Sequence, residues 1–333
     1  MKKHIMGGQW KRFLKKRSKR SAKRKQKRKS KIKLRKQNHT RLIIDSPLSL
    51  SFIHNKQETA EFFHKIIKGA KSNKKIFLNL QKVTKITGDA ILYLLSIAEK
   101  YAKKSILIEG SSPLNVEAAK YLEASGFYNF ANTGKKFHSI NHNFFKIRRG
   151  TEVEPKILQE AIQFSMSKCQ NKDILNFLKK EIYRSLNEAT GNVKQHAYLH
   201  QSEERLWWLL VEFIEFENRL RFYVLDSGLG IPQTIEKKIL EKLFDFLPLP
   251  GLLRHYTDAD YILSAMKGQF RTRTKKPFRG LGLPEICDIA NNNNVSEFTI
   301  VSNYGFLDVK KEVKETLHKK IFGTILTWEI QLS

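Results

Sequence analysis

The sequence predicts an α/β protein in which two folded domains follow a basic N-terminal segment. A chain of 333 residues with 41% hydrophobic content is long enough to form two packed cores. Apolar strand-like runs alternate with amphipathic helices over residues 41–133, and two helices followed by apolar runs occupy residues 154–333. Residues 134–153 are basic and irregular in pattern, which predicts a linker between the two domains.

The basic segment is confined to the start of the chain. Residues 1–36 contain nineteen Lys or Arg and no acidic residue, within a chain whose net charge is +30. Such a segment repels itself and lacks apolar periodicity, so we expect residues 1–40 to be a disordered arm. Nucleic acid is the favoured partner of residues 1–36, because counterion release from a phosphate backbone stabilises binding without any reading of bases. A solvated tail and contact with anionic lipid are the alternatives.

The elements of residues 41–133 repeat a strand–helix unit. Period-2 and period-3.6 apolar patterns distinguish the strands from the helices. The predicted strands are Arg41–Ile44, Lys75–Leu80 and Ser105–Glu109, and the predicted helices are Glu58–Ile67, Asp89–Tyr101 and Val116–Ala124.

The second domain begins with helices and ends with strands. Apolar periodicity predicts helices over Ile157–Phe164 and Ile174–Tyr198. Two apolar runs, Arg205–Glu215 and Arg219–Leu225, flank a short polar turn and predict a hairpin. A last strand pair, Glu297–Ser302 and Gly323–Gln331, closes the chain.

Four short motifs in this second domain contain candidate site residues. In the first, Glu188, Asn192 and His196 recur every four residues, so a helix places them on one face. In the second, Asp226 ends an apolar strand and precedes Gly228 and Gly230, which permit a tight turn and a close approach of the backbone to a ligand.

The third and fourth motifs are rich in glycine. A Gly-rich turn that opens a helix can cradle phosphate groups with its backbone amides at the positive end of the helix dipole. The fourth motif opens the last strand of the chain. The residues concerned are Arg279, Gly280, Gly282 and Leu283 in the third motif, and Gly323 and Thr324 in the fourth.

These four motifs, in this order, resemble those of the GHKL (Bergerat-fold) ATPases and kinases, and the resemblance spans most of residues 154–333. It implies an α/β sandwich with a mixed sheet covered by helices, a bound ATP and Mg²⁺. By this resemblance Asn192 offers its amide oxygen to Mg²⁺ and Glu188 is the catalytic general base. Asp226, Gly228 and Gly230 would bind the adenine, and Arg279, Gly280, Gly282, Leu283 and Thr324 would lie near the phosphates. Residues 233–278 correspond to the mobile lid of that family.

The first domain also resembles a known family. Residues 76–130 are similar to the STAS domain of anti-sigma-factor antagonists, in which a serine at the start of a helix is phosphorylated by a GHKL kinase. Asp89 stands at that position here. An aspartate forms no serine phosphate ester, so it either imitates the phosphorylated state or is an acidic residue favoured by the helix dipole.

The predicted function is an ATP-dependent, Mg²⁺-dependent regulatory switch that associates with nucleic acid through residues 1–36. The STAS-like domain would sense or dock a partner protein. A serine/threonine protein kinase of the anti-sigma type that acts on a partner protein is one alternative. A non-hydrolysing ATP-binding accessory protein of a phage-defence or stress system is the other. An apolar signal core and a run of about 18 apolar residues are both absent. Cys169 and Cys287 lack partners at metal-ligand spacing, and we expect a cytoplasmic protein.

Overall fold

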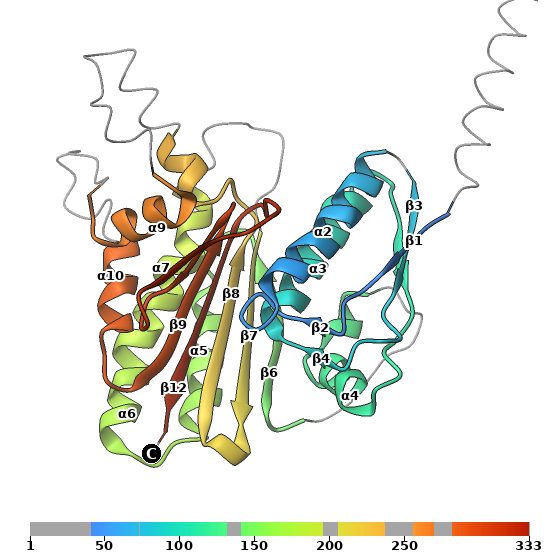
Figure 1. Cartoon of the computed structure of the whole chain (residues 1–333). Coiled ribbons are helices and arrows are strands. Elements are labelled where there is room, and N and C mark those ends of the chain that lie inside the picture. Colours follow the sequence, from blue (N-terminus) through green and yellow to red (C-terminus); the bar gives the residue numbers. More distant parts are fainter. Residues whose placement is uncertain are drawn as a thin grey trace, which may run out of the picture.

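The computed structural model describes residues 41–72, 74–131, 141–195, 206–236, 256–269 and 282–332. Two α/β units lie side by side, and the N-terminal one packs against a large sheet of the C-terminal one (Figure 1). The basic arm of residues 1–40 lies outside the described residues, as do Arg279, Gly280 and most of the predicted lid.

The N-terminal unit is built around a three-stranded parallel sheet of order β1-β3-β5, as the repeated strand–helix pattern predicts. A second pair, β2 with β4, is also parallel and contains two residues on each side. The elements are β1 (Arg41–Asp45), β2 (Ser49–Leu50), α2 (Lys56–Lys71), β3 (Lys75–Asn79), β4 (Lys85–Ile86), α3 (Gly88–Ala102), β5 (Ile108–Gly110), α4 (Val116–Ala124) and the 3₁₀ turn η1 (Phe127–Asn129).

The C-terminal unit contains a seven-stranded sheet of order β11-β10-β9-β12-β8-β7-β6. Its helices all lie on one face of that sheet (Figure 1). The elements are β6 (Phe144–Gly150), α5 (Pro155–Met166), α6 (Lys172–Phe177), η2 (Leu178–Ile182), α7 (Tyr183–Gln195), β7 (Trp207–Ile214), η4 (Glu215–Glu217), β8 (Arg219–Asp226), α9 (Asp258–Met266), α10 (Gly282–Ala290), β9 (Val295–Ser302), β10 (Gly305–Asp308), β11 (Val313–Thr316) and β12 (Thr324–Gln331).

Every adjacent strand pair in this sheet is antiparallel, so the expectation of a mixed sheet is wrong. The β7–β8 hairpin fixes a strand direction locally, through a turn in which Asn218 adopts the left-handed conformation. The β9–β10 hairpin does the same through the two-residue turn of Asn303 and Tyr304. The directions of β9 and β12 relative to β8 depend on crossovers that strand patterns alone do not specify.

The expected linker is shorter than the sequence indicates. Residues 144–150 form β6, which pairs with β7 at the edge of the sheet. Phe145 and Ile147 alternate with basic residues there and are buried. This alternation is typical of an edge strand. The basic residues give the segment the composition of a linker, so composition alone does not indicate the strand.

The seven-stranded sheet is buried on both faces. On one face, side chains such as Trp207, Leu209 and Phe222 share a core with α5, α7 and α10. On the other face, Trp208, Tyr223 and Leu225 share a core with α2 and α3 of the N-terminal unit. The two-residue alternation of β-strands therefore assigns odd and even positions of β8 to different cores.

A helical run extends from Lys172 to Gln195 and is interrupted once, by the π-turn η2 between α6 and α7. Insertions of this kind are frequent next to functional sites. Within the described part of the chain, no helix combines the length and the apolar composition needed to cross a membrane.

Candidate functional site

The second motif forms a turn at the C-terminal end of β8. The Asp226 carboxylate accepts a hydrogen bond of 2.8 Å from the backbone N–H of Gly228. A Cβ at residue 228 would lie 2.7 Å from that same carboxylate oxygen, so glycine lets the carboxylate keep this position. Phe222 and Val224 of β8 belong to the helix-side core. By alternation the Asp226 side chain faces the helices too.

Two residues that sequence reasoning missed hold this turn in place. Asn303 donates to the Leu229 carbonyl at 2.9 Å and accepts from the backbone N–H of Gln233 at 3.1 Å. The Ser302 hydroxyl accepts from the backbone N–H of Ile231 at 2.9 Å. The sequence Asn303-Tyr-Gly after a strand was the available signal, because asparagine tolerates the positive φ of 52° found there.

Gly230 makes close contact with this pair. Its φ is +89°, and a Cβ would lie 2.6 Å from the Asn303 side-chain nitrogen and 2.8 Å from the Ser302 hydroxyl. The second motif therefore fits between the ends of β9 and β12 only with glycine at this position.

The fourth motif meets the second across the sheet. Thr324 opens β12 opposite Asp226 on one side and Ser302 on the other. Its hydroxyl lies 3.2 Å from that of Ser302. A Cβ at Gly323 would stand 1.9 Å from the Asp226 carbonyl oxygen, so glycine permits this approach. Asp226, Gly228, Gly230 and Thr324 thus form one cluster.

The first motif lies on α7, which contacts both β8 and α10. Glu188 is half-buried there. Burial raises the pKa of the Glu188 carboxyl, the neighbouring Glu285 carboxylate raises it further, and Arg184 opposes both effects. A carboxylate with a raised pKa is better suited to accept a proton near neutral pH.

Arg184 and Glu285, which sequence reasoning did not single out, connect α7 to α10. The Arg184 Nε donates to a Glu285 carboxylate oxygen at 3.0 Å, and a second nitrogen of the guanidinium bonds the other oxygen. Glu285 lies in the first turn of α10, the helix that begins at Gly282 of the third motif. This bidentate pair joins the helices of the first and third motifs.

The remaining candidates are placed in part. Asn192 lies on α7 one turn after Glu188, and its side chain is outside the described residues, as is His196. Leu283 packs beside Ile235, Tyr261 and α9. Among the described residues, no group of three His, Cys, Asp or Glu could hold a metal ion.

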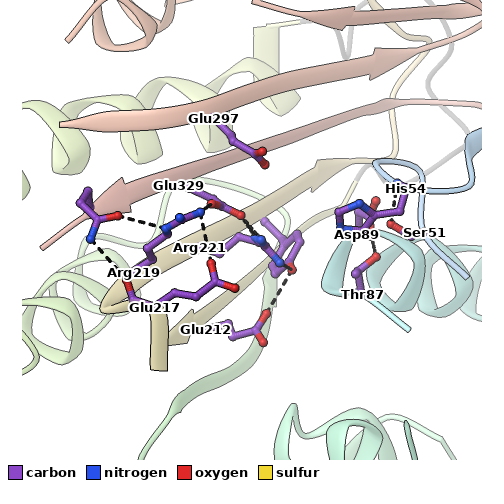
Figure 2. A network of polar contacts seen from close by, with 12 residues as sticks. Ser51, His54, Thr87, Asp89, Glu212, Glu217, Arg219, Arg221, Glu297 and Glu329 are labelled. Carbon is purple, nitrogen blue, oxygen red and sulfur yellow. Dashed lines mark hydrogen bonds and ion pairs between the residues drawn. The ribbon is translucent and has the colours of Figure 1, made fainter. Parts of the chain in front are cut away.

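A second polar cluster lies on the opposite face of the sheet, where the two units meet (Figure 2). The Glu329 carboxylate, at 0% exposure, bonds Arg221 and lies 3.2 Å from an Arg219 nitrogen. The Glu212 carboxylate accepts from the Tyr121 hydroxyl at 2.8 Å and the Tyr223 hydroxyl at 3.1 Å. Burial raises the pKa of Glu212, against the opposing effect of Arg221.

Asp89 lies at the same interface, in the first turn of α3, and is 0% exposed. Its carboxylate accepts from the backbone N–H groups of Phe52 and Ala90, both at 2.8 Å, and from the Thr87 hydroxyl. Burial raises the pKa of Asp89, against these hydrogen bonds. The carboxylate therefore links the start of α3 to the loop after β2.

No model of a known protein family matches the chain, and no curated protein matches its sequence at a significant level. The functional argument therefore depends on the geometry of the site.

Proposed function

We propose that residues 154–333 form an ATP-binding domain of the GHKL (Bergerat-fold) type, which acts as a regulatory switch together with a STAS-like N-terminal domain. The observation that supports it most is the cluster of Asp226, Gly228, Gly230 and Thr324 at one end of the sheet, beside the helix that contains Glu188. Three of the four motifs have the expected context of a helix, a strand-to-turn junction and a strand start. Of the third motif, the structure describes the start of its helix, at Gly282.

The described residues fit a nucleotide at this position. Gly228 and Gly230 leave the backbone of the turn without side chains that would obstruct a flat base. The Asp226 carboxylate has further lone pairs with which to accept from an adenine amino group. The start of α10 presents backbone N–H groups at the positive end of a helix dipole, which favours phosphate.

Asn192 is the residue of α7 that would hold Mg²⁺. One amide oxygen with phosphate oxygens and water is an ordinary ligand set for this ion. When bound, Mg²⁺ would neutralise charge on the phosphates.

Glu188 is the proposed general base. Its raised pKa lets it take a proton from a water or from an acceptor hydroxyl. Arg184 limits the rise of that pKa, and its bidentate pair with Glu285 fixes the position of the guanidinium. Whether water or a protein hydroxyl reacts distinguishes the ATPase from the protein kinase, the second candidate function.

The position of Asp89 bears on the kinase alternative. Because the carboxylate is 0% exposed, it is inaccessible to another protein in this structure. Its three hydrogen bonds favour a structural role at the start of α3 over a charge displayed to a partner. A role as a phosphoserine mimic would therefore require the structure around this carboxylate to open.

Equilibrium binding of Mg²⁺-ATP to the full chain tests the proposal. Asp226→Asn keeps an oxygen for the Gly228 N–H and loses the charge, and we expect it to weaken binding at least about tenfold. Asp173→Asn, on the exposed first turn of α6, is the matched control. Equal affinity of the three proteins for ATP would overturn the proposed site.

Turnover measurements separate the two activities. Loss of ATP hydrolysis in Glu188→Gln supports the assigned base, whereas unchanged hydrolysis would refute it. Radiolabel transferred from ATP to a partner protein would favour the kinase. Retention of DNA or RNA by a chain that lacks residues 1–36, equal to that of the full chain, would remove the arm from the switch.

A further inference from the structure

A cavity of about 1210 Å³ lies between the two units, on the face of the sheet that packs against α2 and α3, and it borders the candidate nucleotide turn. One wall comes from the C-terminal ends of α2 and α3, and the other from the turn that follows Asp226 and from Lys320 to Phe322. We call it the lysine cavity.

Six lysines line this cavity, and they come from three separate segments. Lys68 and Lys71 belong to α2, Lys100 to α3, Lys103 and Lys104 to the turn after α3, and Lys320 to the segment before β12. Of the described residues around the cavity, Glu99 is the one carboxylate, and it already pairs with Arg149 and with Lys103 at 3.8 Å. The cavity therefore has a large excess of positive charge.

Helix capping explains only part of this cluster. Lysines in the last turn of a helix stabilise its dipole, and Lys68, Lys71 and Lys100 stand in such positions. Lys104 and Lys320 lie outside these helices. The Lys320 ammonium is held 3.3 Å from the Gln233 side-chain oxygen, at the opposite wall from α2. Like charges brought together from two units at one cavity repel one another, and a polyanion bound there would offset that repulsion.

The remaining lining is apolar or uncharged. Ile67 and Phe322 are half-buried and contribute carbon surface, with the buried Leu206 and Trp208 behind them, and the Lys100 ammonium lies 4.7 Å from the centroid of the Phe322 ring. A site that combines an apolar wall with several ammonium groups suits a ligand with an apolar ring and phosphates. The volume is far larger than a single phosphate needs and agrees with a ligand of nucleotide size.

We propose that the lysine cavity binds a phosphate-bearing small molecule of nucleotide size, with its phosphates against the lysines and its apolar part against Ile67 and Phe322. The cavity differs from the proposed ATP site, because the Asp226 and Thr324 side chains face the helices on the other side of the sheet, and the two sites share the turn that contains Gly228. A ligand in the lysine cavity does not require ATP at the candidate nucleotide site.

Such a ligand would act on the switch directly. Ser227, Gly228 and Leu229 form part of the cavity wall, and Gly228 belongs to the turn that holds the Asp226 carboxylate. A bound anion would therefore join α2 and α3 to the back of the candidate nucleotide turn, and would stabilise the contact between the two units by neutralising their lysines.

Lysine acetylation footprinting of the full chain tests this inference residue by residue, so that binding to the basic arm does not obscure the result. The probes are inorganic tripolyphosphate and, separately, ADP without Mg²⁺. We expect saturable protection of Lys68, Lys71 and Lys320 at concentrations that leave the exposed Lys179 and Lys180 unchanged. Protection no greater than that of these two reference lysines would overturn the proposal.

A matched pair of double variants tests whether the cavity itself binds the probes. Lys68→Gln with Lys71→Gln should raise the concentration of half-protection at Lys104 and Lys320 at least about tenfold. The control, Lys179→Gln with Lys180→Gln, removes equal charge from η2 and should leave that concentration unchanged. Equal shifts in both double variants would mean a general charge effect and would refute the site.

Two further measurements distinguish the lysine cavity from the proposed ATP site, and a small-molecule ligand from a nucleic acid. Protection that persists in Asp226→Asn supports a site separate from the proposed ATP site, and its loss in that variant would contradict the separation. Protection of the cavity lysines by a short single-stranded oligonucleotide, with none by ADP or tripolyphosphate, would refute a small-molecule ligand.

Discussion

The two faces of the seven-stranded sheet are buried in different ways. On the helix side, the core is apolar, and the Trp328 ring stacks between Phe222 and Phe298 at centroid distances of 5.5 and 5.8 Å. On the side of the N-terminal unit, the carboxylates of Glu212 and Glu329 and the Arg221 guanidinium are buried with α3 against the same strands. One face therefore depends on packing and the other on charge pairing as well.

The two faces should therefore differ in how strongly substitutions in them lower stability. An apolar core tolerates changes that preserve volume, whereas a buried charge that loses its partner leaves an uncompensated desolvation cost. The contact between the two units contains these charges and borders the lysine cavity. A change in charge or pH there should alter how the units associate, and the helix face should respond far less.

The largest expected effect is that of Arg221→Met. It leaves Glu329, with 1% side-chain exposure, without its closest cation and should lower the free energy of unfolding by about 3–5 kcal/mol. Arg41→Met is the control, because Arg41 and Glu109 are about half exposed and their pair should contribute less than about 1 kcal/mol. Urea titrations measure both. Equal losses would show that the charged face has no special sensitivity.

Gly88→Ala tests the packing of α3 on the sheet. A Cβ there would lie 2.4–2.7 Å from three carbons of the Tyr223 ring, and we expect a loss of about 1–3 kcal/mol. Gly191→Ala on α7 is the matched control. Its Cβ meets only Val153, at 3.5 Å, so higher helix propensity should stabilise the chain by about 0.5–1 kcal/mol. A stabilising Gly88→Ala would contradict the close contact between the units.

The charged face should also make the stability of the chain depend on pH, through Glu212. Because folding raises the pKa of Glu212, the folded chain holds this proton more tightly than the unfolded one. Stability therefore falls as pH rises from the unfolded pKa of about 4.3 to the folded pKa, by at most about 1.4 kcal/mol per pH unit.

Glu212→Gln keeps an acceptor for Tyr121 and Tyr223 but has no proton to lose. The free energy of unfolding of this variant, relative to the unmodified chain, should rise with pH through that window. Glu117→Gln, whose side chain is 80% exposed on α4, is the control. A pH-independent difference for Glu212→Gln would mean that this carboxyl is ionised in the folded chain.

The smallest expected effect concerns the helix face. Arg184 is largely exposed, so Arg184→Gln should cost less than about 1 kcal/mol of stability. The Glu285 carboxylate then loses its partner, and the pKa of Glu188 should rise further. The acidic limb of the pH profile of ATP turnover should shift to higher pH, and an unchanged limb would argue against Glu188 as the base.

Local patterns predict the individual elements well. The helices around α2, α3 and α4 and the strands β7, β8, β9 and β12 lie where periodicity indicates them, within a few residues. The short strands β2, β4, β10 and β11 contain too few residues to show a period. The strand β6 is hidden by its basic residues.

The candidate site likewise combines features that local sequence predicts with contacts between distant residues that it does not. The Asp226 turn and the Glu188 helix follow from residues near each other in the chain. The residues that hold them, Ser302, Asn303 and Glu285, act across 70 to 101 positions, which no local pattern specifies. The network of Arg221 with Glu329 spans 108 positions and depends on a strand order that only the fold shows.

Hydrogen exchange of the full chain, with and without Mg²⁺-ATP, tests whether a nucleotide binds between the Asp226 turn, α7 and α10. We predict slower exchange in three segments that are distant in sequence: Asp226–Thr234, the second half of α7 and the first turn of α10. The exchange of α4 should stay unchanged. Unaltered exchange in all three segments at saturating ATP, or protection confined to the N-terminal unit, would contradict the proposed nucleotide site.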